Sequence, residues 1–115
     1  EVRTFAGDVS SEDDVAAAVE AAKVDGKLTT CVAAAGDGTL GPVIATSLDE
    51  WNRVLGVSLT GVFLTFKHAG AAIAASGGGS MVAVARCFTN QLFNRSCNYL
   101  QVRSDLASRA TPGGD

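Results

Sequence analysis

The chain has 115 residues, of which 47% are hydrophobic and 18% are charged, and its formal net charge is -3. This length is typical of one domain at most, and the apolar fraction is too high for a disordered segment. Nine basic residues against twelve acidic ones leave no basic stripe, so we expect no nucleic-acid partner.

Three elements are predicted in the first third of the chain. Val2–Ala6 is a short β-prone run. Ser10 and Ser11 then precede three acidic residues, a pattern typical of a helix start, and apolar residues at helical spacing continue to an Asp-Gly stop at 25–26. Leu28–Ala34 contains no residue more polar than threonine and predicts a buried strand, followed by a glycine-rich loop.

The longest element follows this loop. Ser47 and Glu50 form an S-x-x-E capping box, which predicts the start of a helix that we extend over Leu48–Ala75. Its apolar stripe at helical spacing consists of Leu48, Trp51, Leu55, Leu59, Val62, Phe66 and Ile73, and Trp51 is expected in the core. Ser80–Ala85 predicts another short strand. Alternating strands and helices imply an α/β fold with parallel strands joined by right-handed crossovers.

Cellular location and membrane contact are expectations from the same patterns. The apolar run Leu59–Ala75 contains Lys67 and His68 and is shorter than a membrane span of about 20 residues, so we expect no membrane partner. Three scattered cysteines fit neither a disulfide framework nor a zinc site, so we expect a cytoplasmic protein without a bound metal. The chain begins at Glu1 with no signal-peptide pattern, and we expect it to be a piece of a longer protein.

The composition changes at Arg86. Residues 1–85 hold 5 basic and 10 acidic residues and 17 alanines, whereas residues 86–115 hold 4 basic and 2 acidic residues and 2 alanines. We therefore divide the chain into a first part, 1–85, and a divergent tail, 86–115, that is weakly helical or irregular. The tail has either a different structural role or a shifted reading frame, and the amino acids alone do not decide between them.

One glycine motif follows the second predicted strand. Residues 36–41 read G-x-G-x-x-G, but Pro42 and a β-branched stretch separate the motif from the helix that begins near Leu48. A phosphate-binding fingerprint needs its last glycines to open a helix whose N-terminus faces the pyrophosphate. We therefore interpret the motif as a loop beside the ligand crevice rather than as a phosphate site.

Several short motifs together resemble the middle of a short-chain dehydrogenase/reductase. They are Asp8-Val9, Cys31-Val32-Ala33-Ala34-Ala35-Gly36, Asp49-Glu50-Trp51, Val57-Ser58-Leu59-Thr60-Gly61-Val62-Phe63 and Gly79-Ser80-Met81-Val82. In order and spacing they match that family's Asp-Val, N-N-A-G, V-N-L-T-G and G-S-I-V patterns over residues 1–85. The resemblance implies a partial Rossmann-like parallel sheet that lacks the first βαβ unit, and with it the glycine-rich phosphate turn.

The resemblance also implies a cofactor and a reaction. The cofactor is NAD or NADP, and hydride passes between its nicotinamide and a small carbonyl or alcohol substrate. By this resemblance Asp8 bonds the adenine amino group, Val9 packs on the adenine, and Ala33, Ala35 and Gly36 lie against the riboses. The family's two strand-end Asn residues are both replaced by alanine here, at Ala33 and Ala34.

The catalytic positions depart further from the family. Ser58 occupies the place of the helix Asn that holds a water in the proton relay. Arg86 falls where the family has its catalytic Ser and cannot take that role. Tyr99 stands at the spacing of the catalytic Tyr, with Arg103 where the Y-x-x-x-K pattern has Lys. On a helix, Arg at i+4 keeps a positive charge near the phenol, although Arg and Lys are not interchangeable.

Three functions stay open. The first is a fragment of an NAD(P)-dependent oxidoreductase, inactive by itself, whose parent is a homo-oligomer. The second is a non-catalytic pseudoenzyme or interaction domain that uses helix 48–75 as an oligomer contact. The third is another doubly wound domain, such as a response-regulator-like or flavin-binding module, which would need clustered acids at strand ends where only Asp8 qualifies.

Overall fold

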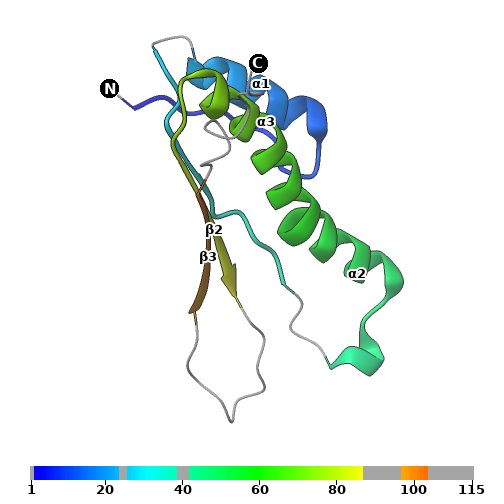
Figure 1. Cartoon of the computed structure of the whole chain (residues 1–115). Helices are drawn as coiled ribbons and strands as arrows, with labels where there is room; N and C mark the ends of the chain where they lie inside the picture. The colour runs from blue at the N-terminus through cyan, green and yellow to red at the C-terminus, as the bar shows by residue number, and fades with distance from the viewer. Residues whose placement is uncertain (1, 24–25, 39–41, 87–96, 104–115) are drawn as a thin grey trace, which may run out of the picture.

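The computed structural model describes residues 2–23, 26–38, 42–86 and 97–103, the last segment and residue 86 by their backbone (Figure 1). The elements are α1 (Glu12–Lys23), β1 (Thr30–Ala33), the 3-10 turn η1 (Val43–Ala45), α2 (Leu48–Leu55), the π-helical turn η2 (Gly56–Thr60), α3 (Gly61–Ala75), β2 (Ser80–Arg86) and β3 (Cys97–Arg103). Helices α2, η2 and α3 follow one another without a break, which confirms the predicted helix 48–75.

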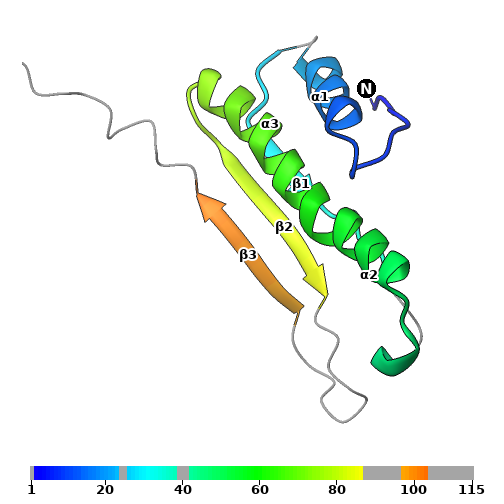
Figure 2. The same cartoon turned by 90° about the vertical axis from the view of Figure 1, so that its right-hand side faces the viewer.

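The sheet has the strand order β1-β2-β3. β1 and β2 are parallel, with Cys31 opposite Met81 and Ala33 opposite Ala83, as the α/β prediction requires. The helical connection between them, α2 to α3, lies over the sheet (Figure 2).

The strand β3 differs from the weakly helical or irregular tail that we expected. It runs antiparallel to β2 over the full length of that strand, with Tyr99 opposite Val84. Helical periodicity in this segment is weak, and an unpaired edge of β2 leaves N–H and C=O groups that a neighbouring strand can satisfy. Pairing with β2 therefore decides the local structure here.

The core lies between α3 and the parallel strands. Its buried hydrophobic residues are Val15, Ala33, Leu64, Ala69, Ile73, Met81 and Ala83. Gly70 lets the Met81 side chain approach α3, because a Cβ there would lie 3.2 Å from Met81 Cε. α1 packs beside α3 rather than on the sheet itself.

The predicted apolar stripe of the long helix is only partly buried. Ile73 is fully buried, but Leu48, Trp51 and Leu59 are 71%, 52% and 63% exposed, so the expectation of a core Trp51 is wrong. A helix of 28 residues is about 42 Å long, whereas a seven-residue strand spans about 23 Å. α3 is the part of the long helix that packs on β1 and β2, and α2 diverges from the strands (Figure 1).

An ionic contact joins α1 to α3. The Glu12 carboxylate accepts a hydrogen bond from Lys67 Nζ at 2.5 Å and lies 3.0 Å from His68 Nε2. These two bonds, and the positive charge of Lys67, lower the pKa of Glu12 below its ordinary value. The contact fixes the start of α1 against the middle of α3.

The segment before α1 contains no strand. Val2–Ala6 has no regular secondary structure, and Val2 and Phe5 are 91% and 52% exposed. The sequence predicted a β-prone run here, but the segment lies outside the sheet, which consists of β1, β2 and β3. The chain then continues into α1. The Asp8 C=O accepts a hydrogen bond from the Ser11 N–H at 3.0 Å, directly before that helix begins.

Length and composition alone would allow helix Leu48–Ala75 to cross a membrane. Its most apolar 18-residue window has a mean hydropathy of 1.3, and 28% of that window is buried. The helix is longer than the run Leu59–Ala75 considered in the sequence. A core helix meets the same criteria, and one side of α3 packs on β1 and β2, so the feature is weak support for a membrane span.

Candidate functional site

A shallow cavity lies where β1 ends, between the loop after that strand and α3. Its volume is about 130 Å³, and its walls are Val9, Val32, Ala33, Ala34, Ala35, Gly61, Val62 and Thr65. The structure thus brings together three residues expected to contact a cofactor: Val9 from the N-terminal segment, and Ala33 and Ala35 from β1 and its loop. Parallel α/β sheets bind ligands at this edge, beyond the carboxyl ends of the strands.

Small residues line this cavity, so that the backbone of the loop after β1 and that of α3 lie close to it. A Cβ at Gly61 would lie 2.9 Å from Val9 Cγ2, so α3 approaches Val9 only because residue 61 is glycine. Gly36 is different, because a Cβ there would meet no described atom within 4 Å. Packing within the described residues does not demand glycine at 36, and the open side leaves room for a flat ligand to approach the backbone.

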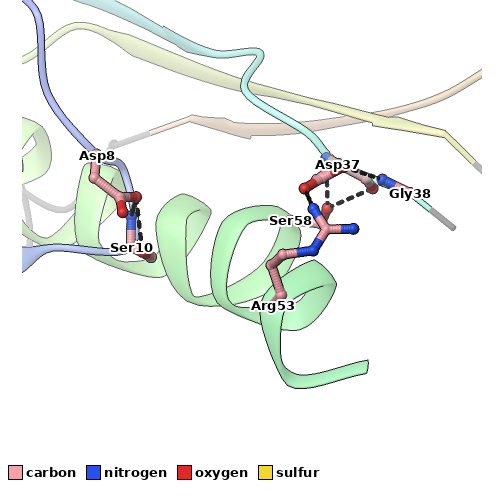
Figure 3. Close-up of polar contacts among 6 residues, drawn as sticks. All are labelled: Asp8, Ser10, Asp37, Gly38, Arg53 and Ser58. Carbon is pink, nitrogen blue, oxygen red and sulfur yellow. Dashed lines mark hydrogen bonds and ion pairs between the residues drawn. The ribbon is translucent and has the colours of Figure 1, made fainter. Parts of the chain in front are cut away.

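Asp8 precedes α1 and lines another cavity of about 110 Å³, which shares Val9 with the cavity at the end of β1. Its Oδ1 accepts hydrogen bonds from the Ser10 N–H at 2.8 Å and the Ser10 hydroxyl at 2.7 Å (Figure 3). The hydroxyl bond first, and the amide bond second, lower the pKa of Asp8 below its ordinary value. Both hydrogen bonds end on Oδ1, so the exposed carboxylate is held as an anion and oriented by the turn that precedes the helix.

Ser58 lies in the wide turn η2 of the long helix. Its hydroxyl donates to the Asp37 C=O and accepts the Asp37 N–H, both at 3.1 Å (Figure 3). Arg53, from the preceding turn, forms an ion pair with Asp37 Oδ2. The Ser58 hydroxyl therefore already donates its proton to the loop after β1. A π-helical turn inside an α-helix is frequent at functional sites.

The glycine-rich loop does not have the geometry of a phosphate cradle at its described end. The Asp37 N–H is taken by Ser58 Oγ, and the Gly38 N–H donates to Asp37 Oδ1 at 2.7 Å. A phosphate site would offer free N–H groups and no carboxylate. The interpretation of residues 36–41 as a loop beside the crevice agrees with these contacts; residues 39–41 lie outside the described part of the chain.

Tyr99 and Arg103 lie on a strand rather than the helix on which their pairing was based. By register, Tyr99 is opposite Val84, near the edge where β1 and β2 end, and Arg103 is opposite Ser80 at the other end of β2. Four residues along a strand span about 13 Å, more than twice the separation of i and i+4 neighbours on a helix. The structure does not bring these two positions together.

Sequence reasoning missed Asp37, Arg53 and the close approach of Gly61 to Val9. Asp37 was visible as the one charged residue of the glycine-rich loop, but its partners lie 16 and 21 positions further along the chain. No local pattern predicts such a contact. Among the described residues, no three His, Cys, Asp or Glu side chains cluster as metal ligands would.

Comparisons with known proteins agree with this geometry. A family model described as "Enoyl-(Acyl carrier protein) reductase" matches residues 1–108, which extends beyond the 85 residues of the resemblance. The short-chain dehydrogenase/reductase eriH of Hericium erinaceus is 40% identical over 72 residues, covering 62% of this chain and 29% of that protein. The D-threitol dehydrogenase of Mycolicibacterium smegmatis is 34% identical over 84 residues, covering 72% of this chain and 32% of that protein.

Solved structures give the same result. A 3-ketoacyl-ACP reductase from Sinorhizobium meliloti has a TM-score of 0.66 and 32% identity, covering 70% of this chain and 32% of the other. A short-chain type dehydrogenase/reductase from Mycobacterium ulcerans has a TM-score of 0.63 and 31% identity, covering 68% of this chain and 29% of the other. The chain belongs to the short-chain dehydrogenase/reductase family of oxidoreductases. It spans about a third of the length of these relatives.

Proposed function

We propose that the chain forms the central part of an NAD(P)-dependent oxidoreductase acting on a small carbonyl or alcohol. The observation that carries the proposal is the cavity of about 130 Å³ in which Val9 faces Ala33 and Ala35 beside an open Gly36. Small side chains at a strand end let a flat dinucleotide lie against the backbone. When bound, the cofactor supplies the hydride acceptor or donor.

In this proposal each residue of the site has a limited task. Asp8 accepts a hydrogen bond from the adenine amino group, because its carboxylate is exposed and charged. Val9 forms one wall of the adenine site, and Ala33, Ala35 and Gly36 contact the riboses through backbone. Ser58 holds the loop through Asp37, so a water in the proton relay would have to use the remaining lone pair of its hydroxyl.

The roles of Tyr99 and Arg103 rest on spacing. Tyr99 belongs to the proposed active site as its proton donor or acceptor, since its backbone lies near the edge where β2 ends. Arg103 lies at the far end of β2 along the strand, so any positive charge beside the phenol would come from another residue. NAD or NADP is the proposed cofactor, and a cytoplasmic setting is proposed with it.

Nuclear magnetic resonance of the ¹⁵N-labelled chain tests the site directly. With NADH and NADPH raised to millimolar concentrations, we expect amide shifts to centre on Val9, Ala35 and Gly36. Binding is expected to be weak, because the described residues form no phosphate-binding turn. Shifts distributed elsewhere, or none, would contradict the proposal. Tight binding would contradict it too, because it would need a phosphate site that the described residues do not form.

The variant Gly36→Val tests whether the dinucleotide lies against the open side of Gly36. Gly36→Val adds a side chain into space that no described atom occupies within 4 Å, so the stability of the chain should change by no more than about 0.5 kcal/mol. The shifts at Val9 and Ala35 should disappear. Shifts that persist in Gly36→Val would place the dinucleotide elsewhere.

A second candidate function is favoured by the exposed apolar side of the long helix. Leu48, Trp51, Leu59 and Phe63 are each more than half exposed. We propose that this side forms a helix-to-helix contact between copies of the protein, which would serve a non-catalytic interaction domain equally well. Sedimentation tests it: the chain should self-associate and Phe63→Glu should be monomeric, whereas a clean monomer for the unmodified chain argues against the contact.

A further inference from the structure

All the polar groups of Asp37 are engaged. Its N–H and C=O both bond the Ser58 hydroxyl, its Oδ1 accepts the Gly38 N–H, and its Oδ2 pairs with Arg53 (Figure 3). The Asp37 side chain is one-third exposed and that of Arg53 about half. One residue of the loop after β1 is thus held through its backbone and its side chain at once, from two positions on the long helix.

Arg53 lies near the end of α2 and Ser58 lies in η2, so the π-helical turn begins between the two positions. Residues five apart on an α-helix point about 140° away from each other, so Arg53 and Ser58 would not normally face the same loop residue. In a π-helical turn the backbone bonds run from i to i+5, which brings such residues closer to one side. In the structure Gly61 N–H bonds the Gly56 C=O, and Figure 3 shows Arg53 and Ser58 both directed at Asp37.

We propose that Arg53 is a positioning residue of the site. It acts through Asp37: the ion pair keeps the carboxylate in place, and this holds the backbone of residues 35–37 against the long helix. In consequence Gly36 keeps the conformation that presents its open side, and the Ser58 hydroxyl keeps its two bonds. The first part rests on the observed contacts, and the consequence for a dinucleotide rests on the proposed function.

The proposal also explains how the loop is held without the two Asn side chains of the family pattern. The two strand-end Asn residues of the family pattern are Ala33 and Ala34 here, so their side chains supply no hydrogen bonds to this edge. The pair of Arg53 and Asp37 anchors the following residues instead. A guanidinium suits this task, because it stays charged and its planar fork favours one orientation of the carboxylate.

Hydrogen exchange of the Asp37 amide in the full chain, without ligand, tests the positioning. Arg53→Met removes the ion pair, and exchange should become roughly two- to fivefold faster, the range for a half-exposed pair. Arg53→Lys keeps the charge but loses the fork and should be intermediate. The control Lys23→Met removes the exposed pair of Lys23 with Glu20 on α1 and should leave Asp37 unchanged.

A charge-reversed pair separates positioning from general destabilisation. Arg53→Asp and Asp37→Arg should each accelerate exchange at residue 37, and the double variant should return it toward the original rate. Unchanged exchange in Arg53→Met, or no rescue in the double variant, would overturn the positioning role. If the role holds but NADH causes no shift at Gly36 even in the unmodified chain, the proposed function fails while the contact stands.

Discussion

The side chain of Val9 rests on Gly61, the first residue of α3, which has no Cβ. A Cβ at Gly61 would come within 2.9 Å of Val9 Cγ2 and 3.3 Å of the Val9 carbonyl oxygen. The N-terminal segment and the long helix therefore meet at a distance that only glycine permits. The same contact forms one side of the candidate cofactor cavity, so packing and function depend on the same position.

Gly61→Ala should destabilise the chain even though alanine favours helices. The gain in helix propensity is about 1 kcal/mol, whereas an overpacked contact costs typically 1–3 kcal/mol. Gly56→Ala is the matched control, because its Cβ would meet Ser10 Cβ at an ordinary 3.7 Å. Urea unfolding should rank the stabilities as Gly56→Ala, then the unmodified chain, then Gly61→Ala. A more stable Gly61→Ala would show that Val9 can move aside.

Among substitutions of a described glycine by alanine, Gly79→Ala should lower the stability of the chain most. A Cβ there would lie 1.9 Å from the Thr29 carbonyl oxygen, which also accepts the Ser80 N–H at 2.9 Å. Backbone rather than a flexible side chain blocks the space, so β1 and β2 must separate where they begin. We expect a loss of roughly 3 kcal/mol or more. Circular dichroism showing an unchanged unfolding midpoint would contradict this geometry.

Ser47→Ala should weaken the start of the long helix. The Ser47 hydroxyl accepts the Glu50 N–H at 3.1 Å, the side-chain cap that the S-x-x-E pattern predicts. Its loss costs typically 0.5–2 kcal/mol. Ser47→Asp retains an acceptor and should restore the stability. Equal unfolding midpoints for the Ala and Asp variants would show that this cap contributes nothing.

The contact of Glu12 with α3 predicts a pH dependence of stability. Lys67 chiefly, and His68, lower the pKa of Glu12 below its ordinary 4.5. A lowered pKa in the folded state means that the contact stabilises fully above 4.5 and is lost as the pH falls through the folded value. Glu12→Gln should flatten the fall in urea midpoint on acidification. Glu20→Gln, an exposed carboxylate on the same helix, should leave that fall unchanged.

Local patterns in the sequence predicted the elements of the described fold well. The acidic start of α1, the cap at Ser47 and the apolar runs Leu28–Ala34 and Ser80–Ala85 each correspond to an element, whereas the β-prone run Val2–Ala6 does not. The two parallel strands followed from their alternation with helices. These features depend on neighbours within about four positions. Local propensity and hydrogen bonding are sufficient to produce them.

The environment of each side chain was predicted less well. The stripe containing Leu48 and Leu59 is correct as a helical pattern, yet both residues are exposed, because they lie in α2 and η2 whereas α3 is the part of the helix that packs on β1 and β2. Periodicity indicates which residues share a face but not what covers that face. Tyr99 and Arg103 show the same limit, since pairing with β2 overrides a weak helical pattern.

The amino-acid order alone thus specified the helices, the parallel pair of strands and the small residues at the strand end, because each is encoded by residues close together in the chain. Tertiary structure decided that Val9 meets Gly61, that Arg53 and Ser58 both hold Asp37, and that β3 closes the sheet beside β2. These contacts join residues 11 to 52 positions apart. Their formation depends on shape and on unsatisfied backbone groups that exist only once the elements have packed.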